Sequence, residues 1–264
     1  MRANVTKQKL NAGETVFGCF VRYPDASLTE MIALQGWDFL VFDAEHGTIE
    51  PRDCEHLVRA AELRDVTPIV RVTTNEPPTI LRFMDTGAQG AHVPFVNSQA
   101  EAEAAVRSVK YWPRGARGLA PVRAAAYGRR DPLSEYVGRA NEETLIAVHI
   151  ETEAAIEDLG RIAEVDGVDV VMIAPTDLSQ SLGVPGQTDH PLVADAVEKI
   201  VSTVANSSVA LGVLVADAKG ARSWQERGAR YVAVTFESLV RASSGSFLAS
   251  ARGAAVDVLD LPPR

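Results

Sequence analysis

The chain alternates along its whole length between short apolar runs and longer amphipathic segments. The apolar runs are rich in β-branched and aromatic residues, which is typical of buried strands. Eight strands are predicted, at residues 16–21, 39–42, 68–71, 90–93, 145–150, 170–173, 211–215 and 231–234. Between them the spacing predicts helices, such as 52–64 and 100–109, the second with Ser98 as its cap and Glu101 three residues later. The alternation therefore predicts repeated β–α units.

Eight parallel strands in a chain of 264 residues favour a closed (β/α)8 TIM barrel. The alternative is an open doubly wound sheet, but no predicted strand leads into a G-x-G-x-x-G turn or a G-x-x-x-x-G-K-[ST] loop. We predict one domain, residues 1–264. Residues 253–264, which end in Leu-Pro-Pro-Arg, are expected to form an extended tail that is frayed or docked on a neighbouring subunit.

Polar and charged side chains follow the predicted strands at the points where those strands end. Barrel enzymes carry their active sites at the carboxyl ends of the strands, so these side chains are expected to meet. They are Asp43, Glu45, His46, Arg71, His149, Glu151 and Asp177.

Glu151 and Asp177 come from consecutive strand ends and suggest a metal site. Two carboxylates suit Mg²⁺ or Mn²⁺, with substrate and water completing the octahedron. His149 is two residues before Glu151, so both side chains leave the strand on one face, with His149 the deeper. Taken singly, either acid could instead be a helix cap or half of a surface ion pair.

Asp43, Glu45 and His46 form the closest group of titratable side chains among the predicted site residues. Histidine titrates near neutral pH, and a neighbouring carboxylate can raise its basicity, which makes His46 a candidate general base. A turn histidine bonded to backbone is the alternative. Arg71 ends an apolar run, where a guanidinium needs an anion: a substrate carboxylate or oxyanion, or a salt bridge to Asp43 or Glu45.

The remaining histidines and the lysines are weaker candidates for the active site. His56, His92 and His190 are expected to be structural. No lysine lies at a predicted strand end, and Lys110 precedes a long loop at residues 111–127. This pattern favours metal chemistry over a Schiff-base lysine. The long loop is expected to cover the site or to contact another subunit.

Composition narrows the classes of partner. The net charge of −9 and the pI near 5.1 argue against a nucleic-acid partner and, weakly, against an anionic membrane surface. We expect no signal peptide and no membrane helix, and hence a cytoplasmic protein. Cys19 and Cys54 are expected to be reduced core residues.

Several strings together resemble the HpcH/HpaI family of class II pyruvate aldolases, in family order and spacing from about residue 10 to residue 248. They are Phe-Asp-Ala-Glu-His-Gly at 42–47, Val-Arg-Val at 70–72, Pro-Arg-Gly-Ala-Arg-Gly at 113–118, Ile-Glu-Thr at 150–152 and Ala-Pro-Thr-Asp-Leu-Ser at 174–179. The resemblance implies a barrel of the phosphoenolpyruvate/pyruvate-binding type. It also implies reversible cleavage of a 4-hydroxy-2-oxo acid to pyruvate and an aldehyde, through a metal-stabilised enolate.

The resemblance also implies a role for each site residue. Glu151 and Asp177 would bind the divalent metal (Mg²⁺, Mn²⁺ or Co²⁺), and the backbone N–H of Thr176 would bind the ketoacid carboxylate. His46 would be the base and Arg71 would stabilise the enolate and hold the ketoacid. Asp85 would raise the basicity of the histidine, a role that Asp43 could share. The resemblance further suggests a homohexamer, and it places candidates for the aldehyde pocket at Phe20, Arg22 and Tyr23.

Two positions depart from the family pattern. Ala44 stands where many members have glycine, and His149 stands where glutamine usually contacts the substrate. We expect His149 to keep that contact and to alter substrate choice. Two alternatives to an aldolase are open: a lyase acting on an acyl-CoA ester, for which only Arg114, Arg117, Arg129 and Arg130 suggest a basic patch, and a non-catalytic ketoacid-binding barrel.

Overall fold

Eight parallel strands close into a barrel in sequence order, β1 pairing with β8, in the computed structural model, which describes residues 1–253. The predicted (β/α)8 fold is confirmed, and each predicted strand lies within two residues of the observed bounds. The strands are β1 Val16–Val21, β2 Phe39–Asp43, β3 Thr67–Arg71, β4 Gly90–Val93, β5 Leu145–Ile150, β6 Val170–Ile173, β7 Ala210–Val215 and β8 Ala229–Thr235.

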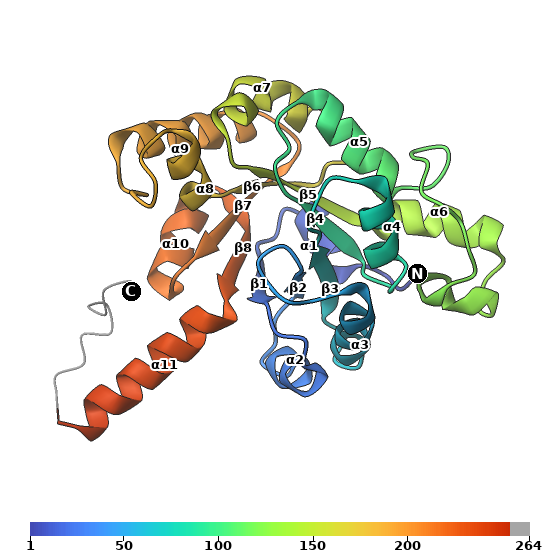
Figure 1. Cartoon of the computed structure of the whole chain (residues 1–264), viewed down its shortest axis with the longest axis horizontal. Helices are drawn as coiled ribbons and strands as arrows, with labels where there is room; N and C mark the ends of the chain where they lie inside the picture. Colours follow the sequence, from blue (N-terminus) through green and yellow to red (C-terminus); the bar gives the residue numbers. More distant parts are fainter. Residues whose placement is uncertain (254–264) are drawn as a thin grey trace.

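Helices surround the strands as an outer ring (Figure 1). Their apolar faces pack on the outside of the sheet and form the larger hydrophobic cluster. They are α1 Val5–Asn11, α2 Ala26–Ala33, α3 Pro51–Glu62, α4 Pro77–Met84, α5 Gln99–Val109, η1 Arg123–Gly128 (a 3-10 helix), α6 Leu133–Glu143, α7 Glu153–Ala163, α8 Pro175–Ser181, α9 Pro191–Val204, α10 Ala218–Glu226 and α11 Phe236–Ala251.

The barrel interior is filled by side chains that alternate along each strand. Phe39 and Met172 fill the lumen opposite Gly18 and Gly212, where a Cβ atom would stand 2.1 Å from the Phe39 ring and 2.3 Å from the Met172 sulfur. Side chains alternate along a strand, so Phe39 and Asp43 of β2 both point into the barrel, with Asp43 nearer its carboxyl end. Packing below therefore sets the direction in which the polar side chains at the mouth point.

At the amino-terminal end of the barrel, α1 contacts the strand starts through Thr6, and the loop at residues 111–127 attaches to the ends of α4 and α6. The Lys110 ammonium group, before this loop, donates to the carbonyls of Asn141 and Thr144, just before β5 begins. The prediction that this loop covers the active site is wrong, because its attachments hold it at the opposite end of the barrel. The alternative, a subunit contact, stays a prediction.

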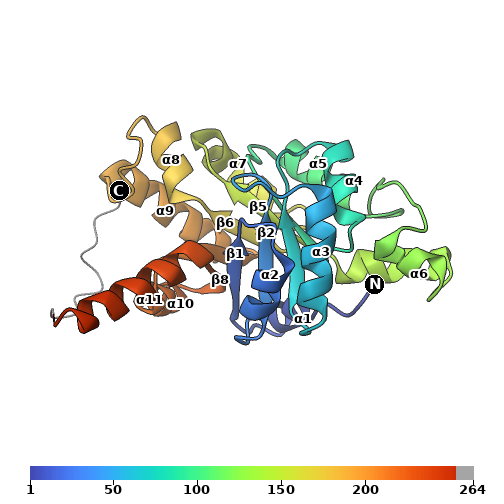
Figure 2. The same cartoon turned by 60° about the horizontal axis from the view of Figure 1, so that its bottom comes forward.

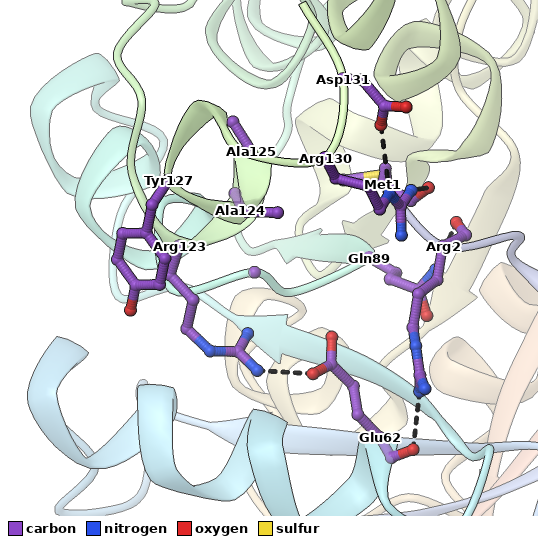
Figure 3. Close-up of a pocket in the computed structure, with 12 residues that line it drawn as sticks. Met1, Arg2, Glu62, Gln89, Arg123, Ala124, Ala125, Tyr127, Arg130 and Asp131 are labelled. Carbon is purple, nitrogen blue, oxygen red and sulfur yellow. Dashed lines mark hydrogen bonds and ion pairs between the residues drawn. The ribbon is translucent and has the colours of Figure 1, made fainter.

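A cavity of about 300 Å³ lies at that same end, between η1 and the first residues of the chain (Figure 3). Two ion pairs lie in its wall, Arg123 with Glu62 at 2.5 Å and Arg130 with Asp131 at 3.1 Å. Met1 and Arg2 line it as well.

The last helix, α11, leaves the barrel instead of packing along it. Both views show it running outward from the end of β8 (Figures 1 and 2). None of its 16 residues is buried. The predicted tail lies, after Gly253, outside the described residues.

Two further predictions concern the chain as a whole. Cys19 and Cys54 are free and buried, as predicted. No helix in residues 1–253 is long and apolar enough to cross a membrane.

Candidate active site

Arg71 and Asp43 form the rigid centre of the barrel mouth. They are paired in register on β3 and β2, and the guanidinium donates to both carboxylate oxygens, at 2.8 and 2.6 Å. Asp43 is fully buried and Arg71 is 7% exposed. Burial alone would raise the pKa of Asp43, but the hydrogen bonds from Arg71 hold that pKa below its usual value. The pair is neutral overall, and Asp43 holds the charged guanidinium of Arg71 in a fixed position at the mouth.

Glu45 and His46 lie above this pair. A Glu45 oxygen stands 3.2 Å from an Arg71 nitrogen and 4.0 Å from the His46 Nε2 atom. The His46 imidazole is about half exposed, and its backbone N–H donates to Asp43 at 3.2 Å. Asp43 thus orients the His46 backbone, while the carboxylate nearest the ring is that of Glu45. His46 is placed as a candidate base that solvent and substrate can reach.

Glu45 has an unusual protonation equilibrium. Burial raises the pKa of its carboxyl from 4.5 to about 7 against the opposing effect of Arg71, and the negative charges of Glu151, Asp43 and Asp177 add to the rise. Between about pH 4.5 and pH 7, Glu45 is therefore protonated in the folded, metal-free protein but ionised in the unfolded chain.

We expect the stability of the metal-free protein to fall as the pH rises through this window, and Glu45→Gln to remove that contribution. Thermal unfolding of both proteins at pH 4.5 to 8, in the presence of a chelator, measures the difference. The gain in melting temperature from the substitution should grow with pH and level off above pH 7. A gain that does not depend on pH would show that Glu45 titrates normally.

Glu151 is held at the end of β5 by two contacts, one to each oxygen. The backbone N–H of Phe95 donates to one oxygen at 2.7 Å, and the Nδ1 atom of His149 lies 3.3 Å from the other. Burial would raise the pKa of Glu151, but the contact with His149 holds it below its usual value. Glu151 is therefore an oriented, ionised carboxylate.

Asp177 faces Glu151 from the first turn of α8. Burial and the charge of Glu151 raise the pKa of Asp177, as expected for two carboxylates without a cation between them. Within residues 1–253 no three or more His, Cys, Asp or Glu side chains converge as a complete metal cage. An acid pair of this kind fits a hard divalent cation that takes its other ligands from water and substrate.

Thr176 is the second residue of α8, after Pro175. The first N–H groups of a helix have no partner within that helix. Thr176 is exposed, so its N–H can reach a ligand in the mouth.

Asp85 is the one predicted site residue that lies elsewhere. It caps the C-terminus of α4, and its carboxylate accepts from Arg117 at 2.7 Å, at the amino-terminal side of the barrel. The strand-end pattern does not include it. Its predicted action on His46 has no support in the contacts of this single chain.

The structure adds side chains that the sequence pattern left out. His92, expected to be structural, bonds to His149 inside the barrel, and its other nitrogen bonds to Tyr231. Both ring nitrogens of His149 therefore have protein partners, so a substrate contact would require it to give one up. Of the pocket candidates, Phe20 is buried beneath the Arg71 guanidinium, Arg22 binds Asp43 at 3.1 Å, and Tyr23 is exposed.

The model of one protein family, HpcH/HpaI aldolase/citrate lyase, matches residues 16–243. The chain belongs to the HpcH/HpaI family. It is 34% identical over 249 residues to a hydroxypyruvate/pyruvate aldolase of Roseobacter denitrificans, covering 94% of this chain and 96% of that one. It is 34% identical over 251 residues to a 4-hydroxy-2-oxo-heptane-1,7-dioate aldolase of Escherichia coli, covering 95% of both. The crystal structure of an HpcH/HpaI family protein from Burkholderia cenocepacia superposes with a TM-score of 0.89 at 31% identity, covering 95% of this chain and all of that one.

The HpcH/HpaI match spans every strand of the barrel. The residues described at the mouth, from Phe20 to Asp177, fall within it.

Proposed function

We propose that this HpcH/HpaI family member is a metal-dependent aldolase that reversibly cleaves 4-hydroxy-2-oxo acids to pyruvate and an aldehyde. The observation that carries the proposal is the convergence of Arg71 with the acid pair Glu151 and Asp177 at one barrel mouth. The acid pair would hold a cation, and the Arg71 guanidinium would add a second positive charge at the same mouth. The reaction builds negative charge on the 2-oxo oxygen, and such an arrangement stabilises it.

Arg71, Thr176 and His46 would have separate roles in the reaction. Arg71, held by Asp43, keeps its positive charge directed at the developing enolate oxygen. The Thr176 N–H binds the ketoacid carboxylate. His46 takes the proton from the 4-hydroxyl as the carbon–carbon bond breaks, and returns it in the synthetic direction. The electron pair of the broken bond remains on the pyruvate fragment.

Glu151 and Asp177 would hold the divalent metal, which supplies Lewis-acid stabilisation of that negative charge when bound. Mg²⁺, Mn²⁺ and Co²⁺ all accept two carboxylates, so the identity of the metal stays a prediction. The cytoplasmic location and the action of Asp85 on His46 also stay predictions.

The contacts of the arginines favour an aldolase over a lyase acting on an acyl-CoA ester. Such a lyase needs a basic patch for the phosphates of CoA. Arg114, Arg117 and Arg130 instead form ion pairs with Asp166, Asp85 and Asp131, away from the mouth.

A panel of 4-hydroxy-2-oxo acids tested beside a panel of acyl-CoA esters, with Mn²⁺ present, decides between these functions. We expect pyruvate release from the first panel alone. Cleavage of CoA esters would favour the lyase, and turnover of neither panel would favour a ketoacid-binding barrel.

We propose further that the chain assembles with copies of itself, as the hexamer that the family resemblance suggests. The exposed helix α11 supports this, because Leu239, Val240, Phe247 and Leu248 are between 37% and 71% exposed. Apolar side chains grouped on one surface mark contacts with other proteins.

We therefore expect Phe247→Asp to lower the mass of the assembly measured by light scattering. Ala249→Asp adds the same charge two residues further along, on the opposite side of α11 from Phe247, and it should leave the mass unchanged. A monomeric wild-type chain, or equal masses for the two variants, would contradict the assignment of α11 to the interface.

A further inference from the structure

Three buried polar rings form a line beneath Glu151. The Nε2 atom of His149 lies 2.9 Å from the Nδ1 atom of His92, and the Nε2 atom of His92 lies 2.8 Å from the Tyr231 hydroxyl. His92 and Tyr231 are fully buried and His149 is 3% exposed. They come from β5, β4 and β8, and β4 and β8 stand on opposite sides of the closed barrel. The line therefore crosses the lumen and ends at Glu151.

The carboxylate at the end of the line fixes its direction. An ionised carboxylate only accepts hydrogen bonds, so the His149 Nδ1 atom that faces it must carry the hydrogen. A neutral His149 then has a bare Nε2, which accepts from the Nδ1–H of His92. The bare Nε2 of His92 accepts in turn from the hydroxyl of Tyr231.

The reverse direction leaves a mismatch when both rings are neutral. If Tyr231 accepted from His92, a neutral His149 would turn a lone pair toward the Glu151 carboxylate. A doubly protonated His149 would reverse the line while still donating from Nδ1 to Glu151, and the NMR measurement distinguishes the two states. Burial raises the pKa of Tyr231 well above its usual value, so its hydroxyl keeps the proton that it donates.

We propose that Tyr231 and His92 are positioning residues that fix His149 as an Nδ1–H donor to Glu151. With the N–H of Phe95 on the other oxygen, this fixes the plane of the Glu151 carboxylate. Donors behind a metal ligand orient it, and their loss typically costs about 10- to 100-fold in metal affinity or activity. The inference rests on the proposed function only in taking Glu151 as a metal ligand.

The first test is the tautomeric state of the histidines in the metal-free protein, by nitrogen-15 NMR of histidine-labelled chain. We expect His92 and His149 to be neutral, with hydrogen on Nδ1 and none on Nε2. In Tyr231→Phe, the Nε2 resonance of His92 should shift, because it loses its hydrogen-bond donor, while that of His56 should not. Hydrogen on Nε2 of His149, or a doubly protonated ring, would overturn the inference.

The second test is the affinity for Mn²⁺, by calorimetry. Tyr231→Phe should weaken binding about tenfold. The control is Tyr136→Phe, which removes an equally buried hydroxyl that lies in a separate cluster. Unchanged affinity in Tyr231→Phe, or an equal loss in both variants, would refute the positioning role. If the wild-type chain bound no Mn²⁺, the proposed function would fail, while the tautomers would still decide the direction of the line.

Discussion

Glu151→Gln is expected to abolish Mn²⁺ binding and to reduce pyruvate release by at least about 10³-fold, several kcal/mol of transition-state stabilisation. Glutamine keeps the shape of the side chain but removes the charge that attracts the cation. It also faces the N–H donor of Phe95 with an amide that is free to turn either way. Calorimetric titration with Mn²⁺ and a coupled pyruvate assay measure the two effects.

The matched control is Glu153→Gln, which makes the same change two residues further along. Glu153 is exposed in the first turn of α7, whereas Glu151 is buried. Both binding and turnover should be unchanged there. Equal losses in the two variants would indicate a general effect of charge, and retained Mn²⁺ affinity in Glu151→Gln would remove Glu151 from the metal site.

Arg71→Lys is expected to reduce kcat by roughly 10² to 10³-fold, the usual cost of removing one donor to a developing oxyanion. Lysine keeps the positive charge but cannot donate to both oxygens of Asp43 while also facing the mouth. The loss should therefore appear in kcat at saturating ketoacid. The assay is run well below the melting temperature of the variant, so that unfolding does not contribute to the loss of kcat.

Arg123→Lys provides the comparison, because Arg123 is also a largely buried, ion-paired arginine, at the amino-terminal end of the barrel. It should lose some stability and no turnover. If Arg71→Lys turned over at the wild-type rate, Arg71 would be a structural partner of Asp43 and no more.

The barrel and most of its mouth could be predicted from the sequence because both follow from short-range periodicity. Buried parallel strands are continuous apolar runs, and the residue after such a run must lie at the carboxyl end of the barrel. Asp43, Arg71 and Glu151 are found in this way. Their pairing across neighbouring strands then follows from the register of the sheet.

The line from Tyr231 to His149 could not be predicted in this way. Its members lie on strands that face each other across the lumen, and their contact depends on the closed barrel and not on local spacing. Tyr231 lies at the start of an apolar run, so its ring is predicted to be a core side chain, and the sequence does not indicate a partner for its hydroxyl. The position of the 111–127 loop depends likewise on distant partners, among them Asp85 for Arg117.

Metal-dependent cleavage is tested most directly by pyruvate release from the full chain before chelation, after chelation and after Mn²⁺ is restored. We expect release from a 4-hydroxy-2-oxo acid to stop on chelation and to return with Mn²⁺ in the wild type, but not in Glu151→Gln. Undiminished release from the chelated wild-type protein would contradict metal-dependent cleavage.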